Sequence, residues 1–341
     1  MLTFENDYSE GMAQEILDAY IKYNFEETRG YGLDVHCLNA AKLIKKAVND
    51  ENVDVHFITG GTPCNTLACS LIKPYEAIIS ADCGHINVHE TGAIEHTGHK
   101  IIQVNNKDGK VSAEDVIKVC ESHPDEHMVK PRLVFISNPS EFGTIYSKEE
   151  LVALRKVCDE KGLYLYMDGA RLGSALTSYA NNLTLEDINS LCDLFYIGGT
   201  KNGALYGEAM VIKNDDLKPC FRYLLKQEGF MMAKGRAMGI AFEQFFTDDL
   251  YFKLAKHAND MAYQLKEAFK KHHIKEYMQS YTNQLFVIMD NDLIQKIKEK
   301  YIISFWAKYD DTKSIVRFVT SWATKQEKID EFLKDLEEYI K

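Results

Sequence analysis

The cysteines of this chain form none of the patterns that indicate a disulfide framework or a structural zinc site. All eight are scattered along the 341 residues, and no two of them make a C-x-x-C pair. Isolated cysteines are typical of free thiols in a reducing compartment. We therefore expect a cytoplasmic protein without disulfides.

Long apolar runs and an excess of positive charge are also missing. No uncharged apolar stretch approaches the ~20 residues that a membrane span needs, and no signal peptide is expected at the N-terminus. Lysine and arginine number 40 against 51 aspartates and glutamates, so the net charge is -11. An acidic chain suits neither nucleic acid nor an anionic membrane, and we expect a small-molecule ligand instead.

Three ligand-binding signatures are absent as well. The chain has no G-x-x-x-x-G-K-[ST] loop, no G-x-G-x-x-G turn after a predicted strand and no H-E-x-x-H pair. These absences argue against a P-loop, a dinucleotide-binding turn and a zinc-protease helix. A phosphate ligand would have to bind by another arrangement.

Short apolar runs alternate with amphipathic segments through the middle of the chain. This alternation is typical of βαβ units and predicts an α/β fold with a mainly parallel sheet. The expected strands are Val53–Thr59, Ala77–Ala81, Lys100–Val104, Leu133–Ser137, Leu163–Met167, Leu194–Ile197 and Ala209–Ile212. Three more are expected near Gln284–Met289, Ile302–Phe305 and Ile315–Thr320.

Helix signals suggest how the chain divides into domains. Capping-box patterns at Ser147, Thr184 and Thr324 predict three helix starts, and residues 234–272 are expected to form one long helix. A chain of this length is too long for one compact core. We expect a large domain over residues 36–245 and a smaller C-terminal α+β domain over residues 246–341.

Two reactive side chains follow predicted strands. Asp168 ends the 163–167 strand, and Lys201 lies in the glycine-rich turn after the 194–197 strand. Ligands of open α/β sheets bind beyond the carboxyl ends of the strands, so both side chains should face one crevice. Pyridoxal 5'-phosphate (PLP) requires such a pair: an amine for its aldehyde and a carboxylate that keeps its ring nitrogen protonated. The alternative is an Asp–Lys salt bridge that lines a cleft.

The turn after the first predicted strand is suited to a phosphate. Gly60, Gly61 and Thr62 stand between that strand and a helical segment. Such a turn offers backbone N–H groups and the positive end of a helix, and Thr62 adds a hydroxyl. An ordinary glycine turn is the alternative.

A group of histidines follows the 77–81 strand. The ring of His85 could lie over a planar cofactor or act as an acid or base. His85 and His89 are four residues apart, with His96 and His99 close behind, which raises a metal site as an alternative. Their spacing fits no standard site, so we expect no metal and interpret the last three as packed or solvated histidines.

Two arginines are candidates for a substrate carboxylate. Arg171 lies three residues after Asp168, and Arg317 alternates with apolar residues on a predicted strand. A guanidinium fork matches a carboxylate bidentately. For Arg317 the alternative is an arginine on the solvent face of an edge strand.

Together these segments resemble the low-specificity L-threonine aldolase and β-eliminating lyase family, PLP enzymes of the aspartate-aminotransferase fold (fold type I). The resemblance runs in order along nearly the whole chain. Its most diagnostic stretches are Asp168-Gly169-Ala170-Arg171-Leu172 and the turn at Thr200-Lys201. It also includes residues 6–11, 30–34, 60–62, 82–98 and 317–320.

The resemblance implies a role for each candidate residue. The implied catalytic residues are Lys201, His85 and Asp168. The implied cofactor contacts are Gly61, Thr62, His85, Asp168, Arg171, Thr200, Lys201 and Lys234. The implied substrate contacts are Asn6, Tyr31, Arg171 and Arg317. Tyr31 and Lys234 would lie near the site of a neighbouring subunit, and residues 1–35 would form a segment near the site and the subunit interface.

The activity that the resemblance implies is retro-aldol cleavage of L-threonine or L-allo-threonine to glycine and an aldehyde. β-Elimination or transamination of another small amino acid is the alternative, and a catalytically silent PLP-binding protein is a third reading. A homodimer or homotetramer with shared sites is expected. Glu5-Asn6-Asp7-Tyr8 replaces the Arg-Ser-Asp-Thr usual in the family, which leaves the preferred side chain open.

Overall fold

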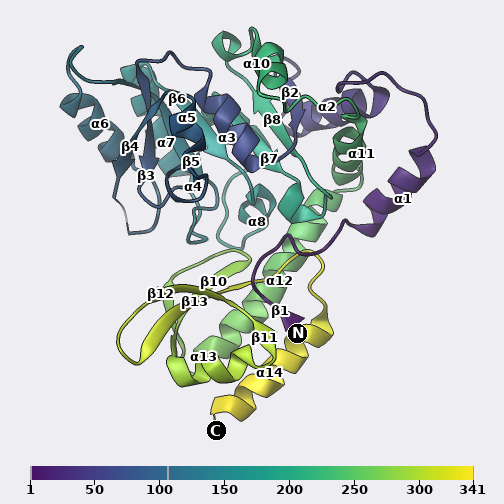
Figure 1. Cartoon of the computed structure of the whole chain (residues 1–341), viewed down its shortest axis with the longest axis vertical. Helices are drawn as coiled ribbons and strands as arrows, with labels where there is room; N and C mark the ends of the chain where they lie inside the picture. Colours follow the sequence, from purple (N-terminus) through teal and green to yellow (C-terminus); the bar gives the residue numbers. More distant parts are fainter. Residues whose placement is uncertain (1, 106, 341) are drawn as a thin grey trace.

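The computed structural model describes residues 2–105 and 107–340. Its elements form two lobes (Figure 1), a larger one built on a seven-stranded sheet and a smaller one built on a four-stranded sheet. The long helix α12 (Leu250–Lys271) extends from the first lobe into the second. It contacts α8 (Leu172–Leu176) in the large lobe and α14 (Gln326–Ile340) in the small one. No helix within the described ranges is long and apolar enough to cross a membrane.

The large sheet contains every strand that was expected before residue 213. Its strands are β2 (Asp54–Ile58), β3 (Glu76–Ala81), β4 (Lys100–Val104), β5 (Lys130–Ser137), β6 (Tyr164–Asp168), β7 (Leu194–Gly198) and β8 (Glu208–Ile212). Their order is β2-β8-β7-β6-β5-β3-β4. The pairs from β7 to β4 are parallel, whereas β8 runs antiparallel to both of its neighbours. The predicted α/β fold with a mainly parallel sheet is confirmed.

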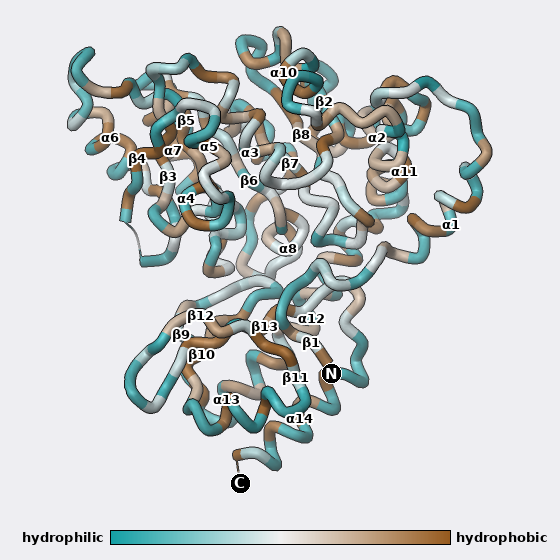
Figure 2. The backbone as a smooth tube through the Cα atoms, in the orientation of Figure 1, coloured by the Kyte–Doolittle hydropathy of each residue, from teal (hydrophilic) through white to brown (hydrophobic). Residues whose placement is uncertain are grey.

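The inner strands of this sheet are buried on both faces, which explains why β3, β6, β7 and β8 are mainly apolar. Along β6, Leu165 and Met167 belong to the core on one face, and Tyr166 belongs to the core on the other. Along β7, Phe195 and Tyr196 point to opposite faces in the same way. Figure 2 shows apolar stretches along the strands and more hydrophilic ones on the outlying loops.

Helices cover the sheet and complete the large lobe. The longer ones are α1 (Gln14–Tyr23), α2 (Val35–Ala47), α3 (Gly61–Cys69), α6 (Ala113–Ser122), α7 (Lys148–Lys161), α9 (Leu185–Leu191), α10 (Phe221–Gln227) and α11 (Arg236–Phe245). Single turns are α4 (His85–Val88), α5 (Ala93–His96), η1 (Thr200–Asn202) and η2 (Asp215–Leu217). Two predicted capping boxes are confirmed, at Ser147 for α7 and at Thr184 for α9.

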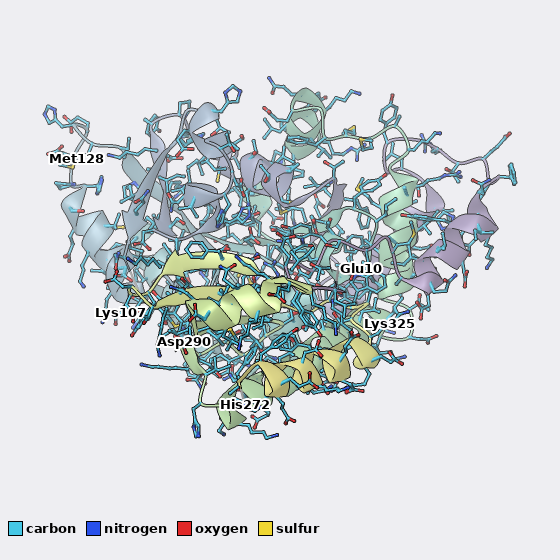
Figure 3. All side chains as sticks on the ribbon, turned by 60° about the horizontal axis from the view of Figure 1, so that its bottom comes forward. Glu10, Lys107, Met128, His272, Asp290 and Lys325 are labelled. Atoms are coloured by element: carbon cyan, nitrogen blue, oxygen red, sulfur yellow. The ribbon has the colours of Figure 1, made fainter. Side chains whose placement is uncertain are left out.

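The small lobe contains an antiparallel sheet and the first residues of the chain. Its strands are β9 (Lys275–Met278), β10 (Gln284–Asp290), β12 (Ser304–Lys308) and β13 (Lys313–Val319), in the order β12-β13-β10-β9. β1 (Leu2–Thr3) pairs with β11 (Tyr301–Ile302), which follows α13 (Asn291–Lys298). Phe4 packs in the same core as Phe318 and Phe332. Figure 3 brings this lobe forward and labels Glu10, whose carboxylate accepts a hydrogen bond from Ser321 (3.2 Å).

The long helix expected over residues 234–272 is interrupted, so that prediction is wrong. α11 and α12 are separated by a turn in which Asp248 and Asp249 have φ of 50° and 57°. Short polar side chains such as aspartate tolerate this left-handed conformation better than most residues. The predicted domain boundary near residue 245 falls at this turn, and the division into domains stays a prediction.

Two smaller predictions for the C-terminal region are also wrong. Thr324 forms no capping box, because its hydroxyl accepts the Ser321 N–H (2.8 Å) and α14 begins only at Gln326. The strand expected over residues 302–305 is divided between β11 and β12, which belong to different sheets.

Candidate active site

The carboxyl ends of β6 and β7 lie side by side. Asp168 and Lys201, the two central candidates, lie at this edge of the large sheet. The Gly198 N–H donates to the Gly169 carbonyl (3.0 Å), and a Cβ at Gly198 would stand 2.3 Å from the Ala170 carbonyl oxygen. Glycine permits this approach because it has no Cβ. Asp168 and Lys201 therefore lie at one edge, and the Asp168 charge acts on the Lys201 amine.

Asp168 is 5% exposed and receives three hydrogen bonds from the protein. One oxygen accepts the Tyr196 hydroxyl (2.5 Å) and the Ala170 N–H (2.9 Å), and the other accepts the Asn65 side-chain amide (3.0 Å). Tyr166 in turn donates to the Asn65 oxygen (2.7 Å), which fixes the orientation of that amide. These donors all match an ionised, acceptor-only carboxylate.

Lys201 lies in the single turn η1 directly after β7. Burial and the nearby Arg171 guanidinium lower the pKa of Lys201, while Asp7, Asp168 and Glu141 act in the opposite direction. A lowered pKa increases the fraction of neutral amine, the form that attacks a carbonyl carbon.

His85 is joined to Asp168 through two residues that the sequence did not single out as partners. The Nδ1 of His85 lies 2.7 Å from the carboxylate of Glu90, and the Asn65 amide donates to the same oxygen (2.6 Å). Burial opposes a charge on the ring, but the hydrogen bond to Glu90 raises the pKa of His85. Asn65 thus links the carboxylates of Glu90 and Asp168.

Of the other histidines in this group, His89 lies beside His85 and His99 has partners elsewhere. The His89 ring lies 5.4 Å from the His85 ring, and His99 contacts Thr97 and the Ile72 carbonyl. Within residues 2–105 and 107–340, no group of three histidine, cysteine, aspartate or glutamate side chains could hold a metal ion.

The predicted phosphate turn forms the start of α3, which begins at Gly61. The first N–H groups of a helix have no partner within the helix, and its N-terminus carries partial positive charge. A Cβ at Gly61 would stand 3.0 Å from the Tyr196 hydroxyl, the same hydroxyl that donates to Asp168. α3 therefore presents its N-terminus and Asn65 to one site.

The two candidate arginines differ in how well they are already paired. Arg171 binds Asp7 bidentately, at 2.7 and 3.0 Å. Asp7 is buried, and its other contact is the Asn283 amide of the small lobe (2.9 Å). Arg317 has only longer contacts, such as the Gln284 oxygen at 3.4 Å, and its buried Nε has no hydrogen-bond partner among the described residues.

Two of the remaining predicted residues have hydrogen-bond partners outside these groups. The Asn6 oxygen accepts the Tyr8 N–H (3.0 Å) in a local turn. The exposed Tyr31 donates its N–H to the Ala233 carbonyl (3.1 Å), next to the exposed Lys234. The site roles of Asn6, Tyr31 and Lys234 stay predictions.

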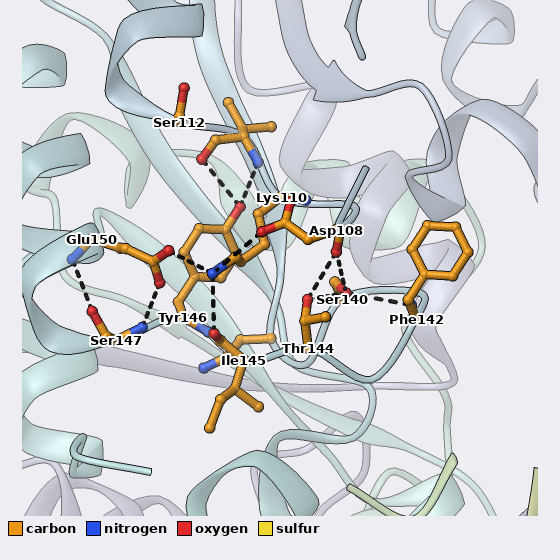
Figure 4. Close-up of polar contacts among 12 residues, drawn as sticks. Asp108, Lys110, Ser112, Ser140, Phe142, Thr144, Ile145, Tyr146, Ser147 and Glu150 are labelled. Atoms are coloured by element: carbon orange, nitrogen blue, oxygen red, sulfur yellow. Dashed lines mark hydrogen bonds and ion pairs between the residues drawn. The ribbon is translucent and has the colours of Figure 1, made fainter. Parts of the chain in front are cut away.

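The loop after β5 adds an acidic residue that the sequence analysis missed. Ser140 and Thr144 both donate to the Asp108 carbonyl, at 3.1 and 2.9 Å (Figure 4). This anchored loop places Glu141 where its charge acts on His85, among other groups of the site. A single acidic residue in a loop gives no sequence signal of such a position.

Sequence comparisons give one result over most of the chain. The family model for β-eliminating lyases matches residues 7–292. A low-specificity L-threonine aldolase from Pseudomonas sp. (strain NCIMB 10558) is 30% identical over 338 residues, which cover 98% of this chain and 96% of that relative. A second, from Saccharomyces cerevisiae, is 25% identical over 80% of this chain and 71% of that relative.

Solved structures agree with the sequence comparisons. A threonine aldolase from Leishmania major superimposes with a TM-score of 0.99 at 45% identity, with full coverage of both chains. An aspartate aminotransferase variant from Thermus thermophilus superimposes with a TM-score of 0.72 at 13% identity, over 99% of this chain and 91% of that one. The second likeness shows a shared fold, the fold type I that was predicted.

Proposed function

Because this chain belongs to the β-eliminating lyase family, we propose that it is a PLP-dependent aldolase that cleaves L-threonine and L-allo-threonine to glycine and acetaldehyde. The observation that supports this most strongly is the full-length similarity to threonine aldolases. The bond that breaks lies between Cα and Cβ of the amino acid.

The residues at the sheet edge fit PLP. An ionised carboxylate can accept about four hydrogen bonds, and Asp168 receives three from the protein, which leaves room for a protonated ring nitrogen. Lys201 would hold the aldehyde end, and the N-terminus of α3 with Gly61 and Thr62 would hold the phosphate. Bound PLP supplies a ring that withdraws electrons from Cα of the amino acid.

His85 is the base that we assign to the β-hydroxyl. In neutral His85, Nδ1–H donates to Glu90, so Nε2 is free to accept a proton. The hydroxyl proton would move to Nε2 while the Cα–Cβ bond breaks and the hydroxyl-bearing carbon becomes an aldehyde. Cα would then take up one proton while Nε2 gives one up, so that glycine and the aldehyde form with no net change in protons.

Arg317 is the residue that we assign to the substrate carboxylate. Its Nε has no hydrogen-bond partner among the described residues, and a carboxylate would satisfy the whole fork. Holding the carboxylate fixes rotation about the Cα bonds and so determines which bond is aligned for cleavage. Arg171 is already paired with Asp7, and its predicted contact with the substrate stays a prediction.

We also propose a cytoplasmic homodimer or homotetramer. Four apolar side chains are exposed around the start of α2, namely Tyr31, Leu33, Val35 and Leu38. A group of this kind is typical of a surface covered by another chain. If a second copy bound to this surface, Tyr31 and Lys234 of one subunit would lie near the active site of the other, as predicted.

The test is the visible spectrum of the purified protein before and after addition of L-threonine or glycine, with an assay for acetaldehyde. We expect the absorbance of bound PLP, a change on addition of either amino acid, and acetaldehyde from threonine. Lys201→Ala should abolish the covalent cofactor absorbance and the turnover. Lys213→Ala is the control. Lys213 follows the last residue of β8, at the edge of the sheet opposite to Lys201, so this variant should retain the absorbance and the turnover.

A yellow, active Lys201→Ala protein would contradict the assignment. Parallel incubations with serine and cysteine, assayed for pyruvate and sulfide, separate aldol cleavage from the β-elimination for which the family is named. Pyruvate or sulfide as the main product would replace the proposed aldol cleavage by β-elimination.

A further inference from the structure

Glu208, the first residue of β8, places its carboxylate against the turn that contains Lys201. The Gly199 N–H donates to one oxygen (2.7 Å), and the Thr200 hydroxyl donates to the other (2.7 Å). The Gly207 N–H donates to the same hydroxyl (3.0 Å), so the hydroxyl proton is free to point at Glu208. Both oxygens of Glu208 are therefore used by the two residues that precede Lys201.

The antiparallel direction of β8 explains how Glu208 reaches this place. Parallel strands present only their last residues at the ligand edge of a sheet. β8 runs the opposite way, so its first residue lies beside Gly198, the last residue of β7. The Glu208 side chain thus joins Asp168 and Lys201 at the same edge.

The backbone segments around this carboxylate are closely packed. A Cβ at Gly199 would stand 2.6 Å from the Gly207 carbonyl oxygen, and Gly207 itself has φ of +110°. Glu208 is 4% exposed. The carboxylate links two segments whose spacing is already set by the glycines.

The charge state of Glu208 matters for these contacts. The titratable groups that face it are Lys201 in η1, Cys64 in α3, Tyr196 in β7 and Tyr251 in α12. Burial raises the pKa of Glu208 to about 7, whereas the Thr200 and Gly199 hydrogen bonds and the Lys201 charge favour the ionised form. The ionised form accepts from both donors more strongly, because hydrogen bonds to a charged acceptor are shorter and stronger than hydrogen bonds to a neutral one.

We propose that Glu208 is a positioning residue whose ionised carboxylate holds the Thr200–Lys201 turn and provides a counter-charge to the Lys201 amine. Its effect on turnover rests on the proposed function. Its effect on the turn itself does not.

The experiment compares the wild-type holoenzyme with Glu208→Gln and with the control Glu76→Gln. Glu76 is also a buried carboxylate that accepts a backbone N–H, but it lies at the start of β3, at the opposite edge of the sheet. In Glu208→Gln we expect kcat for threonine to fall about 10- to 100-fold with KM within about threefold, since a misplaced lysine affects the chemistry more than substrate binding. The pH at which the absorbance of bound PLP changes should move lower, because a negative charge near Lys201 is gone.

Glu208→Asp separates the two parts of the proposal and serves if the glutamine variant does not fold. Aspartate keeps the charge but is too short to reach both donors, so kcat should fall while the pH of the absorbance change stays near the wild-type value. The proposal would be overturned if Glu208→Gln kept the wild-type kcat and the wild-type pH of the absorbance change. It would also be overturned if Glu76→Gln changed kcat and this pH as much as Glu208→Gln does.

A result without any PLP absorbance in the wild type would refute the proposed function but leave Glu208 testable by unfolding. Its pKa is raised from 4.5 to about 7, so the folded protein binds this proton more tightly than the unfolded chain does. The wild type should then lose stability relative to Glu208→Gln as the pH rises through that window. Parallel stability curves for the two proteins would refute the role of the charge.

Discussion

Glu90 lies buried between His85 and Asn65, and its contact with the His85 ring determines which ring nitrogen holds a proton. A histidine whose Nδ1 donates to a carboxylate has a fixed ring orientation and a more basic Nε2. One oxygen of Glu90 has no hydrogen-bond partner among the described residues. The His85 ring and the Asn65 amide therefore both contact the same oxygen of Glu90.

Glu90→Gln should weaken the base without removing it. The hydrogen bond to Glu90 raises the pKa of His85 against the opposing effect of burial, so loss of the charge lowers this pKa. The acid limb of the pH profile of kcat/KM should move to lower pH, and kcat should fall about 10- to 100-fold as the ring loses its orientation. The exposed Glu95→Gln is the control, and an unmoved acid limb would exclude His85 as the titrating base.

Arg317→Lys should affect substrate binding more than stability. A lysine cannot form the bidentate contact of a guanidinium fork, so KM for threonine should rise about 10- to 100-fold. Arg155→Lys is the control, because Arg155 pairs with Asp193 away from the site. Steady-state kinetics give the answer, and an unchanged KM would show that another group binds the carboxylate.

Single residues were predictable where they follow a strand and unpredictable where they act across the fold. Asp168 could be found because it directly follows an apolar run, and Lys201 because it lies in the glycine-rich turn after another one. Glu90, Asp7 and Glu208 are ordinary acidic residues in sequence, and their partners lie 5, 164 and 8 or 9 residues away. Only the folded chain brings them to the site.

At the scale of elements, the inner strands of the large sheet were predictable because burial on both faces makes them mainly apolar. The break between α11 and α12 was not. It depends on two aspartates with positive φ inside a sequence of helical composition, and helical spacing does not report a local change of backbone conformation.

Gly198→Ala tests whether the contact between the ends of β6 and β7 is as tight as described. The added methyl group would stand 2.3 Å from the Ala170 carbonyl oxygen, so the two strand ends would have to separate. Overpacking of this kind costs about 1–3 kcal/mol of the free energy of unfolding. Urea unfolding measures it, with Gly11→Ala as the control because a Cβ there meets nothing within 4 Å. Equal stability of the two variants would contradict the close contact.

At the scale of the whole molecule, Asp7 connects the two lobes. Its carboxylate binds Arg171 of the large lobe and Asn283 of the small one. Although burial opposes its charge, Arg171 holds the pKa of Asp7 below the ordinary 3.8. A lowered pKa means that this carboxylate stabilises the fold above pH 3.8, and that the contribution disappears as the pH falls through the folded-state value.

Asp7→Asn should therefore destabilise the protein at neutral pH and much less in acid. Removing one partner of a buried ion pair leaves Arg171 uncompensated, which costs about 3–5 kcal/mol. Unfolding of both proteins at pH 7 and at pH 3 measures the difference. Asp18→Asn, on the exposed face of α1, is the control. A gap that stays constant between the two pH values would show that the charge of Asp7 is not the cause.

The pairing of β1 with β11 has a consequence for the order in which this protein forms during synthesis. All strands of the large sheet lie before residue 213, but Phe4 packs with Phe318 and Phe332, which follow it by more than three hundred residues in the sequence. Asp7 is tethered three residues behind it. Phe4 precedes every strand of the large sheet in sequence, yet it can pack in its core only after that sheet has been synthesised.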